Sequence, residues 1–275
     1  MLNIEKEIVN RYIIDKMSAP KIAKEYSKNV KTIWKILKAN NVKARTISEA
    51  RMQYTCNDNF FSVIDTEEKA YWLGVLYADG NISTKASKSG QIFLTSVDLE
   101  WVTEFMKAVD SSNKPRSETH KKFNKIIYKA QITSAKMYND LNSLGCTPVK
   151  THTIRLPLIN DDLLHHFIRG YFDGDGTVGI YQNLKNSDWK ILKSGFCSGS
   201  KNFIEDLLKV LPVKNKTIRY SSVYITQFSL NDSIALHNYM YKEATIYLKR
   251  KKDKFTEYLN SYIPRKRFND YNRPS

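Results

Sequence analysis

The feature that most constrains this chain is an internal duplication. Two apolar segments, residues 70–80 and 167–176, each have the composition of a buried helix and end in Asp-Gly, and the two aspartates lie 96 positions apart. Similar runs of strand-like and helical residues follow both segments. A chain of 275 residues therefore has room for two such units and one small additional module.

The pattern after each segment predicts the element order αββαββα, which is built on an antiparallel sheet. The predicted fold class is α+β, with two pseudo-symmetric repeats side by side about a pseudo-two-fold axis. The predicted elements that follow the duplicated segments are strands 91–97, 125–133, 178–182, 190–197 and 218–230, helices 100–109, 135–144, 202–211 and 233–241, and a final basic helix at 247–262.

The chain divides into regions where its periodicity and polarity change. Helical spacing dominates the start of the chain, with predicted helices at 4–16, 20–26 and 30–40, and a polar, irregular stretch follows. The predicted regions are an all-α domain (1–45), a linker (46–66), the first repeat (67–157), the second repeat (158–262) and a basic tail (263–275).

The N-terminal helices suggest a DNA-binding module. Two short helices joined by the break at residues 27–29, the second of them basic, resemble the helix-turn-helix of resolvase-like or homeodomain-like folds. The alternative is a small three-helix bundle with a solvated lysine face. In the DNA-binding interpretation, the residues that face the duplex are Lys28, Asn29, Lys31, Thr32 and Lys35.

The charge of the chain predicts a polyanionic partner. Its 44 Lys+Arg exceed its 28 Asp+Glu by 16, which favours nucleic acid well before an anionic membrane surface. Much of the excess lies near the two ends: the first fifty residues hold eleven basic and five acidic residues, and residues 249–273 hold nine and three. The three cysteines are too few and too far apart for a disulfide scaffold or a CxxC zinc site.

The sequence contains no targeting or membrane signal that we can identify. No apolar run approaches the length of a membrane span. The N-terminus has no basic region followed by an apolar stretch, so a secretory signal is not expected. The expected location is the cytoplasm, of prokaryotic or phage type, or an organellar matrix.

Small residues mark one face of each duplicated helix. Gly74 and Ala78 are four residues apart, as are Gly170 and Gly174, so each helix has a stripe without bulky side chains. Two such stripes allow close packing of the backbones. Asp79 and Asp175 would then lie together at one end of the pair. The glycines that follow them, at 80 and 176, are expected to end the helices in the left-handed conformation.

Two carboxylates at neighbouring helix C-termini repel each other and the helix dipoles. One of them must bind a proton, or cations must occupy the site. Hard divalent cations with oxygen ligands suit such a pair: Mg²⁺ above all, or Mn²⁺, with two or three ions. Metal-activated water could then hydrolyse a phosphodiester. The alternative is that each Asp-Gly is only a polar helix end.

Residues 72–80 and 168–176 resemble the two nine-residue motifs of the double-motif LAGLIDADG homing endonucleases, and the resemblance extends over about residues 60–263. It implies a site-specific endonuclease that cuts both DNA strands across the minor groove and leaves short 3′ overhangs. It also implies a monomer that is an internal pseudo-dimer and forms a DNA-binding saddle. The metal ligands would be Asp79 and Asp175, with the carbonyl groups of Ala78 and Gly174.

The resemblance also implies a lysine in each half of the active site. The segments around residues 144–151 and 247–255 match, with Lys150 and Lys251 as the catalytic candidates; Lys249, Arg250 and Lys252 compete with Lys251. Two motif positions depart from the pattern. Tyr77 replaces the usual Asp at the sixth position, and Arg169 replaces a small apolar residue at the second, where we expect it to extend towards the surface or the DNA backbone.

Recognition of double-stranded DNA would fall to the sheets, since one face of each can pack on helices while the other lies along the major groove. The candidate contacts are Lys85, Lys88, Gln91, Lys125, Tyr181, Gln182, Asn183, Lys190, Arg219, Tyr224, Gln227 and Arg250.

Two other functions are compatible with the pattern. One is a non-catalytic transcription regulator that combines this fold with a helix-turn-helix. The other is a maturase that binds intron RNA. The first of these tends to lose the acidic pair, whereas this chain keeps both Asp79 and Asp175.

Overall fold

The computed structural model describes residues 2–46, 54–84, 90–120, 124–182 and 190–261. The chain divides into two compact units, Met1–Thr55 and Cys56–Ser275. None of the helices in the described ranges is both long enough and apolar enough to span a bilayer. Residues 47–53 of the predicted linker lie outside the described ranges, and so does the whole of the predicted tail, since residues 262–275 are not described.

In the described part of the N-terminal unit, three helices surround a small core. Apolar residues at helical spacing, including Ile8, Ile22, Ile33 and Leu37, are fully buried between the helices. Asn29 caps the third helix, and its Oδ1 accepts a hydrogen bond from the backbone N–H of Lys31 at 2.8 Å. The helices are α1 (Leu2–Ile13), α2 (Ala19–Glu25) and α3 (Val30–Ala39).

The first repeat of the second unit has the order αββαββα. Its four strands form an antiparallel sheet in the order β1-β2-β4-β3. Phe60 and Phe61, which precede it in the predicted linker, are buried in the core of this unit. The elements are α5 (Glu67–Ala78), β1 (Gly80–Ser83), β2 (Gln91–Ser96), α6 (Leu99–Ala108), β3 (Arg116–His120), β4 (Lys125–Thr133) and α7 (Ala135–Ser143).

The second repeat has the same order and an equivalent sheet, β5-β6-β8-β7. A 3-10 turn, η1 (Lys150–His152), precedes it, and a basic helix, α11 (Lys249–Ser261), follows it. The α+β class and the αββαββα order predicted from the sequence are therefore confirmed. The elements are α8 (Asp161–Asp175), β5 (Thr177–Gln182), β6 (Lys190–Ser198), α9 (Lys201–Val210), β7 (Arg219–Tyr220), β8 (Tyr224–Phe228) and α10 (Leu230–Tyr241).

The continuous strand predicted for residues 218–230 is wrong. The chain instead forms the short hairpin of β7 and β8, closed by a turn in which the N–H of Ser221 donates to the carbonyl of Val223 at 3.0 Å. The polar residues at 221 and 222 favour a turn over a strand interior.

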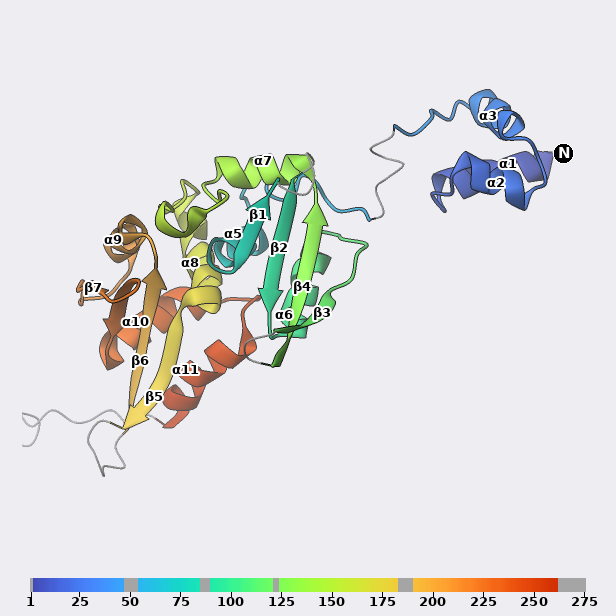
Figure 1. The fold of residues 1–275 in the computed structure, drawn as a ribbon. Helices are drawn as coiled ribbons and strands as arrows, with labels where there is room; N and C mark the ends of the chain where they lie inside the picture. The colour runs from blue at the N-terminus through green and yellow to red at the C-terminus, as the bar shows by residue number, and fades with distance from the viewer. Residues whose placement is uncertain (1, 47–53, 85–89, 121–123, 183–189, 262–275) are drawn as a thin grey trace, which may run out of the picture. The chain divides into compact units, whose positions relative to one another are not determined.

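Alternation along the strands gives each sheet one buried face. Ile92 and Leu94 of β2 are fully buried, and so is Leu192 of β6. Their strand neighbours Phe93 and Lys193 are only half-buried. Figure 1 shows α5 and α8 side by side between the two sheets. Each sheet therefore keeps a second face that is not filled by the core.

Candidate active site

The α5/α8 pair forms the centre of the second unit, and its backbones touch. A Cβ added to Gly74 would lie 2.0 Å from the carbonyl oxygen of Phe167, and one added to Gly170 would lie 1.9 Å from that of Tyr71. The contact is reciprocal, because each glycine admits the other helix's backbone. Any side chain at either position would force the helices apart.

The same stripe continues to the acidic end of the pair. A Cβ on Gly174 would lie 2.4 Å from the Cβ of Ala78 and 3.2 Å from Oδ2 of Asp79. Asp175 is the next residue of α8. The structure thus brings Gly74, Ala78, Gly170 and Gly174 into one interface and places both acids at the same end of it.

Burial raises the pKa of both carboxyl groups. Asp79 keeps part of its surface open to solvent, yet the surrounding atoms remove enough water to raise its pKa to about 6, and the charge of Asp175 adds to the shift. Burial also raises the pKa of Asp175, although Lys251 and Lys150 oppose this. Without a cation, the pair therefore keeps a proton up to a pH well above that at which an ordinary carboxyl group loses its proton.

Lys251 of α11 reaches this site from within the protein. It is 7 % exposed. Its Nζ donates hydrogen bonds to the carbonyls of Phe172 at 2.7 Å, Gly174 at 2.8 Å and Gly176 at 2.6 Å. Burial lowers its pKa to about 8, although nearby carboxylates act in the opposite direction. The amine is therefore held by three acceptors beside Asp175.

Lys150 occupies the matching place in the first half. Its Nζ donates to the carbonyl of Gly80, the residue after Asp79, as Lys251 donates to that of Gly176, the residue after Asp175. The two lysines are thus equivalent in the two repeats, although one lies on η1 and the other on α11.

The three competitors of Lys251 point elsewhere. Lys249 pairs with Asp253 of its own helix. Arg250, also predicted as a DNA contact, pairs with Asp98 at 3.0 Å. Lys252 lies over the ring of Tyr247, 3.7 Å from its centroid. Of the four neighbours, Lys251 is the one that bonds to the carbonyls next to the acids.

Comparison with solved structures places this geometry in a known fold. The homing endonuclease I-WcaI bound to its DNA recognition sequence is similar, with a TM-score of 0.51, 15 % identity, and coverage of 79 % of this chain and 96 % of that one. This chain has the LAGLIDADG homing endonuclease fold. The resemblance predicted from residues 72–80 and 168–176 is confirmed at the level of the fold.

Two further solved structures resemble the chain less closely. The LAGLIDADG meganuclease I-AabMI bound to uncleaved DNA has a TM-score of 0.45 and 14 % identity, covering 70 % of this chain and 89 % of that one. The meganuclease I-SmaMI bound to uncleavable DNA has a TM-score of 0.46 and 12 % identity, covering 71 % and 89 %. No protein-family model matches the chain, and no protein of curated function does.

The glycines after the LAGLIDADG acids do not end their helices as predicted. Gly80 begins β1, and Gly176 has φ −71° and ψ 157°, so both are outside the left-handed region. The prediction is wrong because the chain runs directly from each helix into a strand. A Cβ at either position would lie 2.5 Å from a carbonyl oxygen of the preceding helix turn, that of Leu76 or Phe172.

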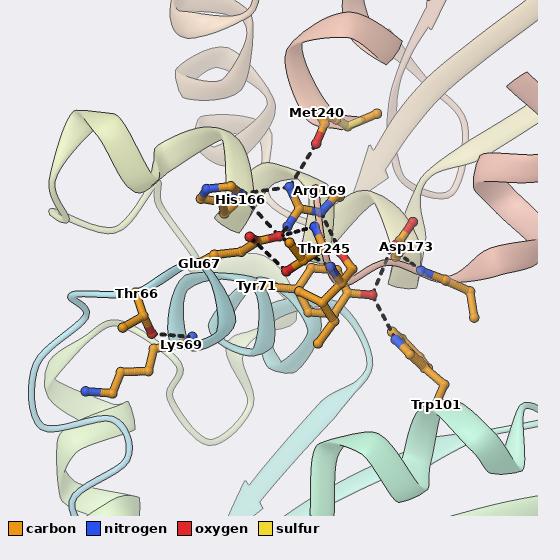
Figure 2. A network of polar contacts seen from close by, with 12 residues as sticks. Thr66, Glu67, Lys69, Tyr71, Trp101, His166, Arg169, Asp173, Met240 and Thr245 are labelled. Atoms are coloured by element: carbon orange, nitrogen blue, oxygen red, sulfur yellow. Dashed lines mark hydrogen bonds and ion pairs between the residues drawn. The ribbon is translucent and has the colours of Figure 1, made fainter. Parts of the chain in front are cut away.

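Arg169, at the second position of its motif, does not extend towards the surface or the DNA backbone, so this prediction is wrong. Its side chain is fully buried, and its guanidinium group bonds to Glu67 of α5 and to the carbonyls of Met240 and Ile246 (Figure 2). These partners satisfy the charge inside the protein, so the side chain has no need to reach water.

The acidic end of the LAGLIDADG pair offers oxygen donors and little else. Among the residues described, no group of three or more His, Cys, Asp and Glu could hold a metal ion. Two carboxylates alone still suit Mg²⁺, which usually keeps several waters and shares its remaining positions with substrate phosphates. The carbonyl of Gly174, predicted as a further ligand, already accepts a hydrogen bond from Lys251, and the structure gives Ala78 no contact that tests its role.

The predicted DNA contacts fall into two groups by strand register. Gln91 and Lys125 lie on the open face of the first sheet, opposite Thr133 and His120. On the second sheet the open face carries the following predicted residues: Tyr181, Arg219 and Gln227.

Three other predicted contacts lie at register positions of the packed face. Gln182 and Lys190 pair with each other at the exposed end of their hairpin, and Tyr224 is half-buried opposite Ser198. Lys85, Lys88 and Asn183 lie outside the described residues.

Several open-face residues were missed by the sequence prediction. The missed positions follow from period-two alternation, since Phe93 and Thr95 share a face with Gln91. Lys193 is likewise on the face of Tyr181, and its Nζ lies 5.8 Å from that ring centroid. Further members of the open faces are Asn81, Arg116 and Gln131.

In the N-terminal unit, the predicted DNA contacts gather at the start of α3. Lys28, Asn29, Lys31, Thr32 and Lys35 are all exposed. The side-chain oxygen of Asn29 caps the helix, so its side-chain NH₂ group is the part left for other contacts.

Proposed function

We propose that this protein is a site-specific double-strand DNA endonuclease. The observation that carries the proposal is the matched pair of half-sites, in which Asp79 and Asp175 end touching helices and Lys150 and Lys251 bond to the carbonyl of the glycine after each acid. A helix pair needed only for stability would not require charges of both signs gathered at one end.

Each group of the site has a separate task in this proposal. Asp79 and Asp175 hold divalent cations, Mg²⁺ or Mn²⁺, two or three in number, which supply activated water and stabilise the developing charge. Because the pKa of Asp79 is raised to about 6, its carboxyl group must lose its proton before it can hold a cation. Lys150 and Lys251 place positive charge next to the reacting phosphates.

The DNA duplex would lie across the open faces of both sheets, with the acids at its minor groove. Cleavage of both strands there leaves short 3′ overhangs, and the two repeats act as an internal pseudo-dimer within a monomer. The N-terminal unit would bind further along the duplex as a helix-turn-helix, with α3 towards DNA. The net charge of +16 favours this partner and predicts steep salt dependence.

The test begins with a randomised duplex library incubated with the full chain and Mg²⁺, followed by sequencing of new ends. The proposal predicts one recurring site with short 3′ overhangs. Asp79→Asn and Asp175→Asn should remove cleavage and keep binding. Asp206→Asn, which breaks an ion pair with Arg155 on the protein surface, is the matched control and should cut normally. Cleavage by the double Asn variant would contradict the proposal.

A non-catalytic regulator is the second candidate, favoured by the exposed basic start of α3. It predicts tight binding of one duplex sequence with no cutting under any divalent cation. A maturase role, with intron RNA as partner, predicts instead that binding to a structured intron competes with binding to duplex DNA.

A further inference from the structure

Each active-site lysine is carried by a segment that lies outside the LAGLIDADG helices. Residues 242–248 connect α10 to α11 and lead to Lys251, and residues 144–149 connect α7 to η1 and lead to Lys150. The position of each amine therefore depends on how its segment is tied to the helix pair. In both halves the tie comes from the sixth residue of the motif, Asp173 or Tyr77.

Asp173 is fully buried and holds the start of α11 (Figure 2). Its Oδ2 accepts hydrogen bonds from the backbone N–H of Leu248 at 2.7 Å and from the hydroxyl of Tyr71 at 2.8 Å. Its Oδ1 accepts from the hydroxyl of Tyr241 at 2.7 Å. The carbonyl of Leu248 in turn accepts from the N–H of Lys251 at 3.0 Å. Asp173 thus fixes the residue from which the first turn of α11 grows.

Glu67 and Arg169 hold the same segment three residues earlier. Glu67 accepts from the backbone N–H of Thr245 at 2.8 Å and from its hydroxyl at 3.0 Å. Arg169 donates to the carbonyl of Ile246 at 2.9 Å and is itself bonded to Glu67 at 2.6 Å. The approach to Lys251 is therefore bound by three charged side chains of α5 and α8.

Tyr77 takes the corresponding role in the first half with the opposite hydrogen-bond sense. Its hydroxyl donates to the carbonyl of Leu144, at the start of the segment that leads to Lys150. The neighbouring Gly145 has φ +91°, and a Cβ there would lie 2.4 Å from the same hydroxyl. The replacement of the usual Asp by Tyr77 is thus matched by a segment that offers a carbonyl and no side chain.

We propose that the sixth motif residue is a positioning residue in both halves: Asp173 sets Lys251 through Leu248, and Tyr77 sets Lys150 through Leu144. Neither residue touches the reacting atoms, and each acts through the segment that it holds. The consequence for cleavage rests on the proposed function, whereas the tie itself can be measured without catalysis.

The first experiment is hydrogen–deuterium exchange of the full chain without DNA, read on peptides covering 144–152 and 245–254. Tyr77→Phe should speed exchange in the first peptide about 2- to 10-fold, because one neutral hydrogen bond is lost. Asp173→Asn should speed exchange in the second about 10- to 100-fold, because bonds to a charged acceptor are lost. Each variant should leave the other peptide unchanged.

Asp232→Asn is the matched control. Asp232 is also a buried carboxylate that holds backbone N–H groups, those of Lys214 and Asn215 at 2.9 Å each, but it belongs to a different connection. It should leave both peptides unchanged. Equal loosening by Asp232→Asn, or no change with Asp173→Asn, would overturn the positioning role.

The second experiment is a double-mutant cycle on single-turnover cleavage. Asp173→Asn should slow cleavage about tenfold with unchanged duplex affinity, and should cost nothing further in the Lys251→Met background. Tyr77→Phe should behave in the same way with Lys150→Met. Additive losses would overturn the proposal. If the wild-type chain cuts no duplex, the proposed function fails, and the exchange measurements alone decide whether the segments are tied as stated.

Discussion

The two halves of the proposed active site hold their lysines in different ways. Lys251 lies on a regular helix, is almost fully buried and bonds to three carbonyls, whereas Lys150 lies on a 3-10 turn after a left-handed Val149 and bonds to one. Their acids and glycines are nevertheless equivalent. The halves share the groups that would do chemistry and differ in the scaffolding behind them, so substitutions in the acids should act equally and substitutions in the lysines should not.

The largest effect is expected at the acids. Asp79→Asn and Asp175→Asn should each lower the cleavage rate by at least about 10³-fold, because each removes a ligand of the cations that would stabilise the transition state. Measurement of single-turnover rates on the selected duplex would check this. The symmetry fails if one variant still cuts both strands at the wild-type rate.

Substitution of the two lysines should lower the cleavage rate by different amounts. Lys251→Met should slow cleavage by roughly 100-fold and Lys150→Met by roughly 10-fold, since Lys251 is the more completely buried donor and its loss leaves three carbonyls without their partner. Strand-resolved gels would show whether each variant accumulates a nick in one strand. Equal losses in both variants would mean that the difference in scaffolding has no catalytic consequence.

Substitution of the two glycines at the helix contact should destabilise the protein by similar amounts. Gly74→Ala and Gly170→Ala place a Cβ 2.0 Å and 1.9 Å from a backbone oxygen, which only a shift of whole helices can relieve. Each should destabilise the protein by about 1–3 kcal/mol or more, and lower Tm by roughly 3–10 °C. Thermal unfolding followed by circular dichroism would measure this. A wild-type Tm in either variant would contradict the reciprocal contact.

Cation binding should depend on pH through Asp79. Its pKa is about 6 without a cation, and only the ionised carboxylate binds one, so protons compete below that pH. Affinity for Mn²⁺ should therefore rise about tenfold between pH 5 and pH 7. Calorimetric titration at the two pH values tests this, with Asp79→Asn as the variant that lacks this competition. Equal affinity at both would contradict the raised pKa.

The smallest effect concerns stability without cations. Because the pKa of Asp79 rises from 3.8 in the unfolded chain to about 6, the folded state binds more protons between these values. Its contribution to stability therefore falls as pH rises from about 4 to 6. Asp79→Asn should raise Tm at pH 7 by only about 1–3 °C, since part of this charge stays solvated, and should leave Tm unchanged at pH 4. Unfolding scans in a chelator would show an unchanged Tm at pH 7 if this is wrong.

The parts of the site that were predictable depend on short-range patterns. The four-residue spacing of Gly74 and Ala78 and the Asp-Gly ends appear within single helices, so duplication alone indicated the pair. The burial of Arg169 could not be foreseen, because its partners Glu67, Met240 and Ile246 lie 71 to 102 positions away.

The face of the sheet on which each predicted DNA contact lies depends on strand register, which flanking position alone does not give. Gln182 and Tyr224 lie at strand ends on the packed side of the register. Alternation from Gln91 alone would have indicated Phe93 and Thr95. For the second hairpin the register itself was needed, since the turn at 221–223 was not recognised.

The reciprocal glycine contact also bears on how such a chain can be divided and recombined. Each half contains both a glycine notch and the backbone that fills one, but two copies of the first half would also place Ala78 against Ala78, where a Cβ opposite that side chain lies only 2.4 Å away. The ion pair of Glu67 and Arg169 is present only once, because Leu73 occupies the place of Arg169 in the first motif. A heterodimer of separated halves keeps that pair and a homodimer of the first half loses it, which gives the two-piece protein an intrinsic preference for unlike partners.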